Sequence, residues 1–372
     1  MIRAFMHLAV AGLGLTLLAG CEIGAKDSAQ TGYRGAGLDQ IVDRSSIKAA
    51  VAIPPAPYPL PPDGGPTAGQ AYQNVRVLGN LSKERFDHLM AEMNQWVAPP
   101  EQGCNYCHNP ENMASDEKYT KIVARRMVQM TQNINSRWAS HVKQTGVTCY
   151  TCHRGQPVPA NIWFTNPGPT RPGGFIARNN GQNLASPSVG LSSLPYDTLT
   201  EYLADKSIDN NAIRVNATTA LPTSKGKPIQ EAEKTFGLMI HMAEGLGVNC
   251  TFCHNTRAIA DWSQSTPQRT TAWHGIRMVR DINGNFMEPL TSTFPRNRLG
   301  VLGDVPKVNC TTCHNGQNKP LNGAHVVEAY PALTKVTVAE GIKAPEDGMK
   351  APDAPPAEPA APQPATPAAP QP

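Results

Sequence analysis

The sequence has few of the side chains from which a protein of this length normally builds its core. Of its 372 residues, 6% are aromatic and 17% are charged. Because aromatic side chains contribute a large share of buried apolar area, this source of core area is small here. The formal net charge is only +4, so the composition gives no support for nucleic-acid binding.

Long apolar segments are also missing, except at the N-terminus. There the run from Ala4 to Gly20 is broken only by His7 and Thr16, and it is short for a spanning helix, which needs roughly 20 apolar residues. It ends in Leu-Ala-Gly-Cys21, the pattern of a bacterial lipoprotein signal, in which the cysteine takes the lipid. We therefore expect a soluble body tethered through Cys21, with an uncleaved N-terminal anchor as the alternative.

Cysteine is used almost entirely in one repeated pattern. Nine cysteines are present, and eight of them belong to four copies of the pentapeptide C-x-x-C-H. The copies contain Cys104 and Cys107, Cys149 and Cys152, Cys250 and Cys253, and Cys310 and Cys313, followed by His108, His153, His254 and His314. In this pattern two thiols one helical turn apart can bond the vinyl groups of a haem, while the adjacent imidazole ligates the iron. The motifs predict a c-type cytochrome with four covalently bound haem c groups.

A redox disulfide and half of a zinc site are the alternatives for any single C-x-x-C unit. Zinc sites pair such units without an invariable trailing histidine, and thiol exchange favours a thioredoxin-like βαβ pattern. Neither pattern surrounds these motifs. The haems would also supply the apolar faces that the composition lacks, so we expect the fold to depend on them.

The segments that precede the motifs have a helical pattern that occurs twice. Apolar residues recur at helical spacing over 81–97 and 116–142 in the first half, and over 236–246 and from 266 onward in the second. We therefore predict a mainly α multihaem cytochrome c with two pseudo-two-fold-related units, each of the order helix, haem, helix, haem. A long irregular connection joins them, and a disordered Pro/Ala-rich tail follows.

The same pattern predicts the divisions of the chain. They are a lipoprotein signal peptide at 1–20, a lipid-anchored extended segment at 21–74, a first dihaem unit at 75–155, a connecting segment at 156–227, a second dihaem unit at 228–330, and a C-terminal segment with the Pro/Ala-rich tail at 331–372.

The second axial ligand of each haem separates a carrier from an enzyme. An open sixth position permits substrate chemistry, whereas Met or His restricts the haem to electron transfer. Five histidines outside the motifs and the signal would allow four bis-His haems: His88, His141, His241, His274 and His325. Four methionines at corresponding helical places offer His/Met pairs instead: Met90, Met127, Met239 and Met278. Core filling is the commoner role of a helical methionine, and we assign it to Met93, Met130 and Met242.

Several strings in these units closely resemble one known family. They are Lys118-Tyr-Thr-Lys-Ile-Val-Ala-Arg-Arg-Met127, Gly146-Val-Thr-Cys-Tyr-Thr-Cys-His-Arg-Gly155, Asn249-Cys-Thr-Phe-Cys-His-Asn255, Ser265-Thr-Pro-Gln-Arg269 and Gly275-Ile-Arg-Met-Val-Arg-Asp281. Together they resemble the tetrahaem cytochrome subunit of the purple-bacterial photosynthetic reaction centre. The resemblance covers the two dihaem units and extends to the lipid site at Cys21, but the Pro/Ala-rich tail is not part of the family pattern.

The resemblance implies a complete set of iron ligands. Met90 would ligate the haem of His108, Met127 that of His153, Met239 that of His254, and His141 that of His314. The last assignment replaces Met278, which the internal repeat alone would offer. Compared with the family pattern, this sequence has one extra residue between Trp96 and Cys104, so Met90 and Met93 are both candidates for the ligand of the first haem. We prefer Met90, because Met93 lies three residues before Trp96, as the family's non-ligand methionine does.

The resemblance also implies partners and a place in the cell. The haems would form a nearly linear file perpendicular to the membrane, in the order His254, His314, His153 and His108 away from the bacteriochlorophyll special pair. A soluble cytochrome c or a high-potential iron-sulfur protein would reduce the distal haem. The chain would be an electron carrier and not an enzyme, lipid-anchored at the periplasmic face of the photosynthetic inner membrane against the reaction centre L and M subunits. Arg269 matches an arginine of the family and would raise the potential of the haem of His254.

Two other functions remain as alternatives. A multihaem enzyme that converts nitrite or hydroxylamine needs a five-coordinate iron, whereas four plausible distal ligands match the four haems. A lipoprotein that passes electrons to a different membrane complex would carry the same haem motifs, and only the strings quoted above favour the photosynthetic assignment.

Overall fold

The computed structural model describes residues 26–30, 39–43, 53–167 and 229–335, together with 189, 191, 194, 197–210, 212, 213 and 215. The predicted signal peptide, the lipid site at Cys21, the Pro/Ala-rich tail and much of the connecting segment lie outside the described residues.

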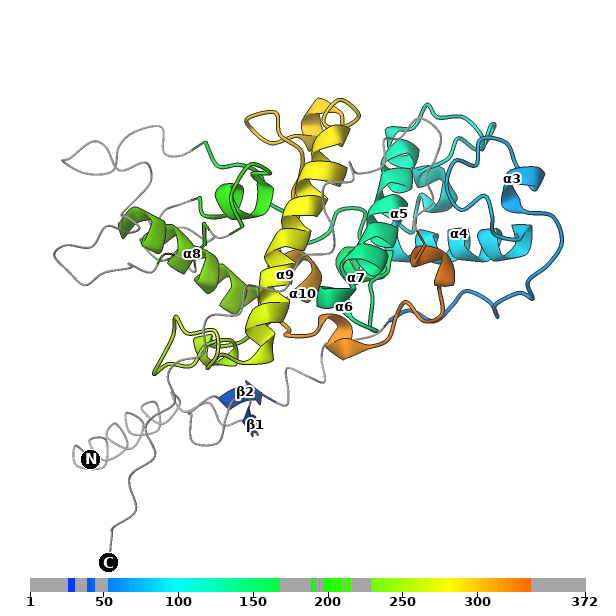
Figure 1. Ribbon diagram of the computed structural model, residues 1–372. Helices are drawn as coiled ribbons and strands as arrows, with labels where there is room; N and C mark the ends of the chain where they lie inside the picture. The colour runs from blue at the N-terminus through cyan, green and yellow to red at the C-terminus, as the bar shows by residue number, and fades with distance from the viewer. Residues whose placement is uncertain are drawn as a thin grey trace, which may run out of the picture.

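The described part is mainly helical, as the sequence predicts. Its four long helices are α4 (Lys83–Val97), α5 (Tyr119–Arg137), α8 (Ile229–Leu246) and α9 (Pro267–Asp281). In Figure 1, α5 and α9 stand in the middle of the molecule, with α4 on the side of the first half and α8 on the side of the second. The helices predicted from the apolar spacing are thereby confirmed, although their ends differ by a few residues.

Shorter elements connect these helices. The short α-helices are α3 (Ala68–Ala71), α6 (Ala139–Val142), α7 (Cys149–His153) and α10 (Cys310–His314). The 3-10 turns are η1 (Gly103–Tyr106), η4 (Cys250–Phe252), η6 (Glu288–Leu290), η7 (Arg296–Arg298), η8 (Pro320–Gly323) and η9 (Pro331–Leu333), and the π-helical segments are η3 (Thr200–Ala204) and η5 (Ile282–Met287). Strands β1 (Lys26–Gln30) and β2 (Asp39–Asp43) pair antiparallel, with Lys26 opposite Asp43. Among the described residues, no helix has both the length and the apolar character that a membrane span requires.

Helix α9 begins where the sequence signal places its start. Thr266 is the N-cap and Pro267 is the first helical residue, a position where the missing proline N–H costs no helical hydrogen bond. The Thr266 hydroxyl donates to the carbonyl of Phe252 over 2.6 Å. The start of α9 is therefore tied directly to the third haem motif.

The predicted helix over 116–142 is wrong in one respect, because the structure divides it at Trp138 into α5 and α6. The indole N–H of Trp138 and the side-chain amide of Asn133 both donate to Asp281 Oδ2 over 2.8 Å. Asp281 is buried at the end of α9, and a buried carboxylate needs such donors. These tertiary bonds, which no local pattern reveals, join α5 to α9 where the helix breaks.

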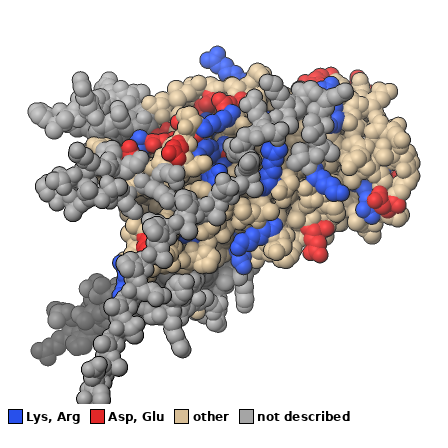
Figure 2. All heavy atoms as spheres, in the orientation of Figure 1, with Lys and Arg blue, Asp and Glu red and all other residues tan. Residues whose placement is uncertain are grey.

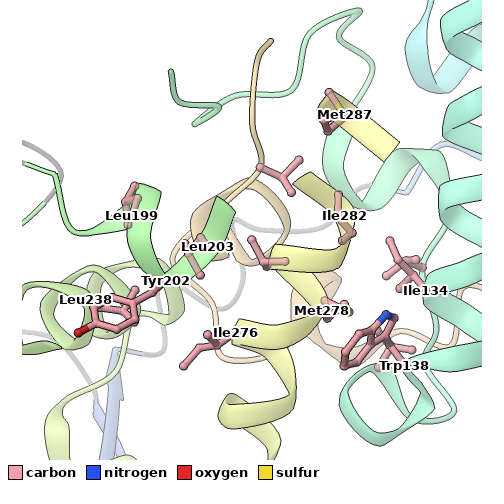
Figure 3. Packing of buried hydrophobic residues seen from close by; sticks show 14 of the residues in the cluster. Ile134, Trp138, Leu199, Tyr202, Leu203, Leu238, Ile276, Met278, Ile282 and Met287 are labelled. Atoms are coloured by element: carbon pink, nitrogen blue, oxygen red, sulfur yellow. The ribbon is translucent and has the colours of Figure 1, made fainter. Parts of the chain in front are cut away.

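The apolar core lies between the two central helices and extends toward α8. Figure 3 shows Ile134 and Trp138 facing Met278 and Ile282 across the α5–α9 contact, with Tyr202 and Leu238 on the other side of α9. A second cluster packs α4 against α5, α7 and η9. On the face drawn in Figure 2, charges of both signs are scattered over a mainly uncharged surface.

The junction between α8 and α10 depends on Gly247. This residue has φ +64°, and a Cβ there would collide with the backbone carbonyl of Gly316. Gly247→Ala is expected to lower the free energy of unfolding by about 3 kcal/mol, since a left-handed backbone strain and a backbone clash add together. Gly303→Ala is the matched control, because Gly303 has φ +78° with nothing within 4 Å, and it should cost only about 1 kcal/mol. Equal thermal unfolding midpoints for the two variants would contradict this account.

Candidate functional site

The four haem motifs adopt two conformations that alternate along the chain. The second and fourth motifs form the helices α7 and α10, whereas the first and third lie on the 3-10 turns η1 and η4. Helix α10 is capped by Asn309, whose side chain accepts from the N–H of Thr312 over 3.0 Å, and Thr148 precedes α7 in a capping box. Such caps stabilise a short helix that would not persist alone.

The ring of each motif histidine is oriented by a hydrogen bond from Nδ1 to a backbone carbonyl. The acceptors are Met113 for His108 (3.1 Å), Gln156 for His153 (2.8 Å), Ile259 for His254 (2.9 Å) and Gln317 for His314 (2.8 Å). Because a carbonyl can only accept, Nδ1 carries the proton and the Nε2 lone pair is free to ligate a metal. Burial lowers the pKa of His314 to about 4, so this ring is neutral at physiological pH.

These hydrogen bonds have a regular sequence spacing. The acceptor lies five residues after the histidine in the first and third motifs and three residues after it in the second and fourth (113 − 108, 259 − 254, 156 − 153 and 317 − 314). The residue that lies two positions after the histidine of the second and fourth motifs is also bonded to the first long helix of the same half. Gly155 N donates to Trp96 O on α4, and Gly316 N donates to Gly245 O on α8, each over 2.9 Å. The local geometry of the first half therefore recurs in the second.

Burial keeps four of the motif thiols protonated, whereas the contact with Cys152 lowers the pKa of Cys313. Burial raises the pKa of Cys149 and Cys310 to about 12 and that of Cys107 and Cys253 to about 11, whereas reactive cysteines have lowered pKa values. In the described ranges, no three His, Cys, Asp or Glu side chains converge on a point that could hold a metal ion. The zinc alternative therefore gains no support from the described residues.

The second and fourth motifs lie side by side. The Sγ atoms of Cys152 and Cys313 are 2.8 Å apart, and α7 contacts α10. By contrast, the first cysteine of the first motif, Cys104, and that of the third, Cys250, are exposed. The structure thus brings two motifs together in its interior and leaves the other two nearer the surface.

His141 on α6 faces the histidine of the fourth motif. The ring centroids of His141 and His314 are 6.0 Å apart, and His141 Nδ1 donates to the Thr271 carbonyl of α9 over 2.9 Å. A ligating imidazole nitrogen lies about 2 Å from its metal and the ring centre about 1 Å further, so rings on opposite sides of one metal have centres about 6 Å apart. The pair therefore has the separation that a shared iron requires.

The other histidines outside the motifs differ in their surroundings. His88 contacts the Tyr58 carbonyl through Nε2 (2.9 Å) and Glu92 through Nδ1 (3.5 Å), and His325 is exposed. His241 Nε2 and His274 Nδ1 are buried without a hydrogen-bond partner in the structure. Buried polar atoms of this kind normally have partners, and polar groups of a bound cofactor would provide them.

The candidate methionine ligands lie on three long helices. Met90, Met127 and Met239 are half-buried on α4, α5 and α8, whereas Met278 is 5% exposed and packs within the central core cluster. The packing of Met278 is that of a core residue. Met90 and Met93 are both half-buried against the α4 cluster, so their burial does not separate them.

Arg269 lies beside the third motif at the third residue of α9. Its guanidinium donates to Ser265 Oγ (2.7 Å) and to the Asp261 carbonyl (3.1 Å), and it stacks over the Trp262 ring at 4.1 Å. Its positive charge also contributes to lowering the pKa of His254, although burial contributes more.

Sequence reasoning missed Gly275 and Lys121. A Cβ on Gly275 would lie 2.6 Å from His141 Cε1, and a glycine inside a helical pattern is a signal for such close packing. Lys121 is buried on α5. In the sequence it looks like an ordinary charged residue of a helix, so no signal marks its burial.

The donor chemistry fits haem c. The motif thiols are unbridged, the Nδ1 hydrogen bonds leave Nε2 of each motif histidine available as a ligand, and the His141 ring lies beside that of His314. The family model for the photosynthetic reaction centre cytochrome C subunit matches residues 22–334.

Three curated relatives are described as photosynthetic reaction center cytochrome c subunits. The protein of Rubrivivax gelatinosus is 51% identical over 342 residues, which cover 91% of this chain and 92% of the relative. That of Thermochromatium tepidum is 46% identical over 334 residues (89% and 81%), and that of Roseobacter denitrificans is 41% identical over 322 residues (82% and 85%). The chain therefore belongs to the family of photosynthetic reaction centre cytochrome c subunits, electron carriers with covalently bound haem c.

Proposed function

We propose that this cytochrome takes electrons from a soluble periplasmic donor and passes them through four c-type haems to the photo-oxidised special pair of the reaction centre. The donor would be a small cytochrome c or a high-potential iron-sulfur protein, and the L and M subunits would hold the special pair. The observation that carries the proposal is the placement of the motifs. The second and fourth touch in the interior through Cys152 and Cys313, and the first and third have exposed cysteines, as a file with two inner and two terminal haems requires.

The proposed ligand set is that of three His/Met haems and one bis-His haem. It pairs His108 with Met90, His153 with Met127, His254 with Met239, and His314 with His141. The Nδ1 hydrogen bond of each motif histidine and the approach of His141 to His314 support this set. Haem iron bound in this way supplies one-electron chemistry at six-coordinate sites.

The two proposed dihaem units, 75–155 and 228–330, gain support from the repeated geometry. The spacing of the Nδ1 acceptors recurs. The second motif is bonded to α4 through Gly155, and the fourth motif is bonded to α8 through Gly316. The protein's contribution is to fix the motif rings, to fasten each motif to a rigid helix and to exclude water around the inner pair.

The position of the N-terminal hairpin supports one orientation toward the membrane. Strand β1 begins five residues after Cys21 (26 − 21), and β2 contacts η4 of the third motif. A lipid on Cys21 would therefore keep the third motif near the periplasmic surface of the membrane, where the haem of His254 can face the special pair. The first motif would point away and receive the donor.

Flash spectroscopy of the chain in complex with its reaction centre tests this function. With all haems reduced, one saturating flash should oxidise the special pair, and its recovery should coincide with the appearance of one oxidised haem. Successive flashes should oxidise further haems one electron at a time. A special pair that stays oxidised while the haems remain reduced would contradict the proposal.

A further inference from the structure

Lys121 shares a hydrogen-bond acceptor with the histidine of the first motif. Its Nζ donates to the carbonyls of Met113 and Ser115, each over 2.8 Å. The Met113 carbonyl also accepts from His108 Nδ1 over 3.1 Å. Lys121 is only 8% exposed, so its ammonium group is held beside the imidazole within the protein.

The positive charge at this place is only partly offset. Asp116 lies 3.5 Å from Lys121 Nζ, but it also accepts from Arg125 over 2.8 Å and lies 3.8 Å from Arg76. Three cations thus surround one carboxylate. The Arg125 hydrogen bond is the largest of the effects that lower the pKa of Asp116 to about 2, so the carboxylate is ionised and is shared among all three.

The other motifs lack this arrangement. In the described part of the chain, no lysine or arginine donates to the Gln156 or Gln317 carbonyl, which orient the histidines of the two inner motifs. Near the third motif, Arg269 donates to the carbonyls of Ala260 and Asp261, next to the Ile259 carbonyl that orients His254. Lys121, by contrast, bonds to an orienting carbonyl itself, that of Met113.

We propose that Lys121 raises the reduction potential of the haem held by His108, an inference that rests on the proposed assignment of that haem to His108 and Met90. Two effects act in the same direction. A poorly solvated ammonium group opposes the additional positive charge of ferric iron, and burial limits screening of this interaction. The lysine also competes for the Met113 carbonyl, which weakens it as an acceptor for the His108 N–H. A weaker acceptor leaves the imidazole less basic and favours the ferrous state.

Redox titration of the haem-loaded full chain, followed in the haem absorption bands, tests the proposal. Each haem gives one wave, a step in absorbance at its own midpoint potential. Met90→His first identifies the wave of this haem, because a second imidazole lowers its potential. Lys121→Met should lower that same wave alone, with a decrease of about tenfold in the reduction equilibrium constant, or about 59 mV for one electron. Lys121→Arg keeps the charge and should restore most of the potential.

Lys118→Met is the matched control, because Lys118 is partly exposed and donates to the Asn105 carbonyl. It should shift the wave less than Lys121→Met does, and an equal shift would overturn the role of the shared carbonyl. If Met90→His moves no wave, the proposed haem assignment fails. If it moves one wave and Lys121→Met leaves that wave in place, the inference about Lys121 fails while the assignment stands.

A second variant covers the case in which Lys121→Met loses haem. Asp116→Asn removes the carboxylate that offsets Lys121, so it should move the same wave upward. A wave that stays in place or moves downward in Asp116→Asn would overturn the inference.

Discussion

Replacing His141 by methionine is expected to raise the midpoint potential of one haem and leave the other three unchanged. A thioether stabilises ferrous iron better than an imidazole does. Axial ligands move haem potentials over a range of about 0.8 V, so we expect a step of the order of 0.1 V. Redox titration combined with electron paramagnetic resonance should show the single bis-His signal replaced by a fourth His/Met signal. Four unchanged potentials would return His141 to a structural role at the end of α6.

Gly275→Ala provides a test of His141 that leaves the residue in place. The new Cβ would lie 2.6 Å from His141 Cε1 and 2.9 Å from its Nδ1, so the ring must move away from the position that faces His314. The bis-His signal should weaken or become high-spin. Gly237→Ala is the control, because its Cβ would crowd Thr198 Cγ2 at the same 2.6 Å without touching a proposed ligand. If the two variants have the same spectrum, the position of His141 does not matter to any haem.

Arg269→Leu is expected to lower the potential of the haem of His254 and almost no other. In an effective dielectric of about 20, two unit charges about 4 Å apart interact by about 4 kcal/mol, and less at a greater separation. We therefore expect a decrease of the order of 0.1 V for one electron. The guanidinium is anchored to Ser265 and to backbone carbonyls, and its charge acts on His254. The midpoint potentials of the four haems in the reaction-centre complex are the measurement.

Arg269→Lys separates charge from structure at this position. It keeps the cation but loses the planar stacking on Trp262, so the potential should remain close to that of the unchanged chain. A shift of all four potentials in Arg269→Leu would indicate misfolding of the α9 start, and no shift in any haem would contradict the tuning role.

The long helices could be predicted because their information is local. The apolar spacing marks α4, α5, α8 and α9, and Thr266-Pro267 marks the start of α9. The division at Trp138 could not be predicted, since it accompanies a hydrogen bond to Asp281, 143 residues away. For the same reason the π-helical turn of η5 after Asp281 has no signal in the spacing.

The candidate site was predictable in its chemistry but not in its surroundings. The pentapeptides name the cysteines and histidines by themselves, because the bonds to haem require that spacing. The carbonyls that orient each histidine belong to loops without a sequence pattern, so their acceptors and the cation on Met113 emerge only from the fold. The choice of His141 over Met278 rests in sequence on family resemblance, and the structure adds the facing rings and the core packing of Met278.

Locating the irons by anomalous scattering from the chain in its reaction-centre complex tests the central claim most directly. The account predicts four iron peaks in a single file, in the order His254, His314, His153 and His108 away from the special pair. One of them should lie between His141 and His314, where the ring centroids are 6.0 Å apart. Fewer than four peaks, a different order, or an iron at His314 whose opposite ligand is not His141 would contradict it.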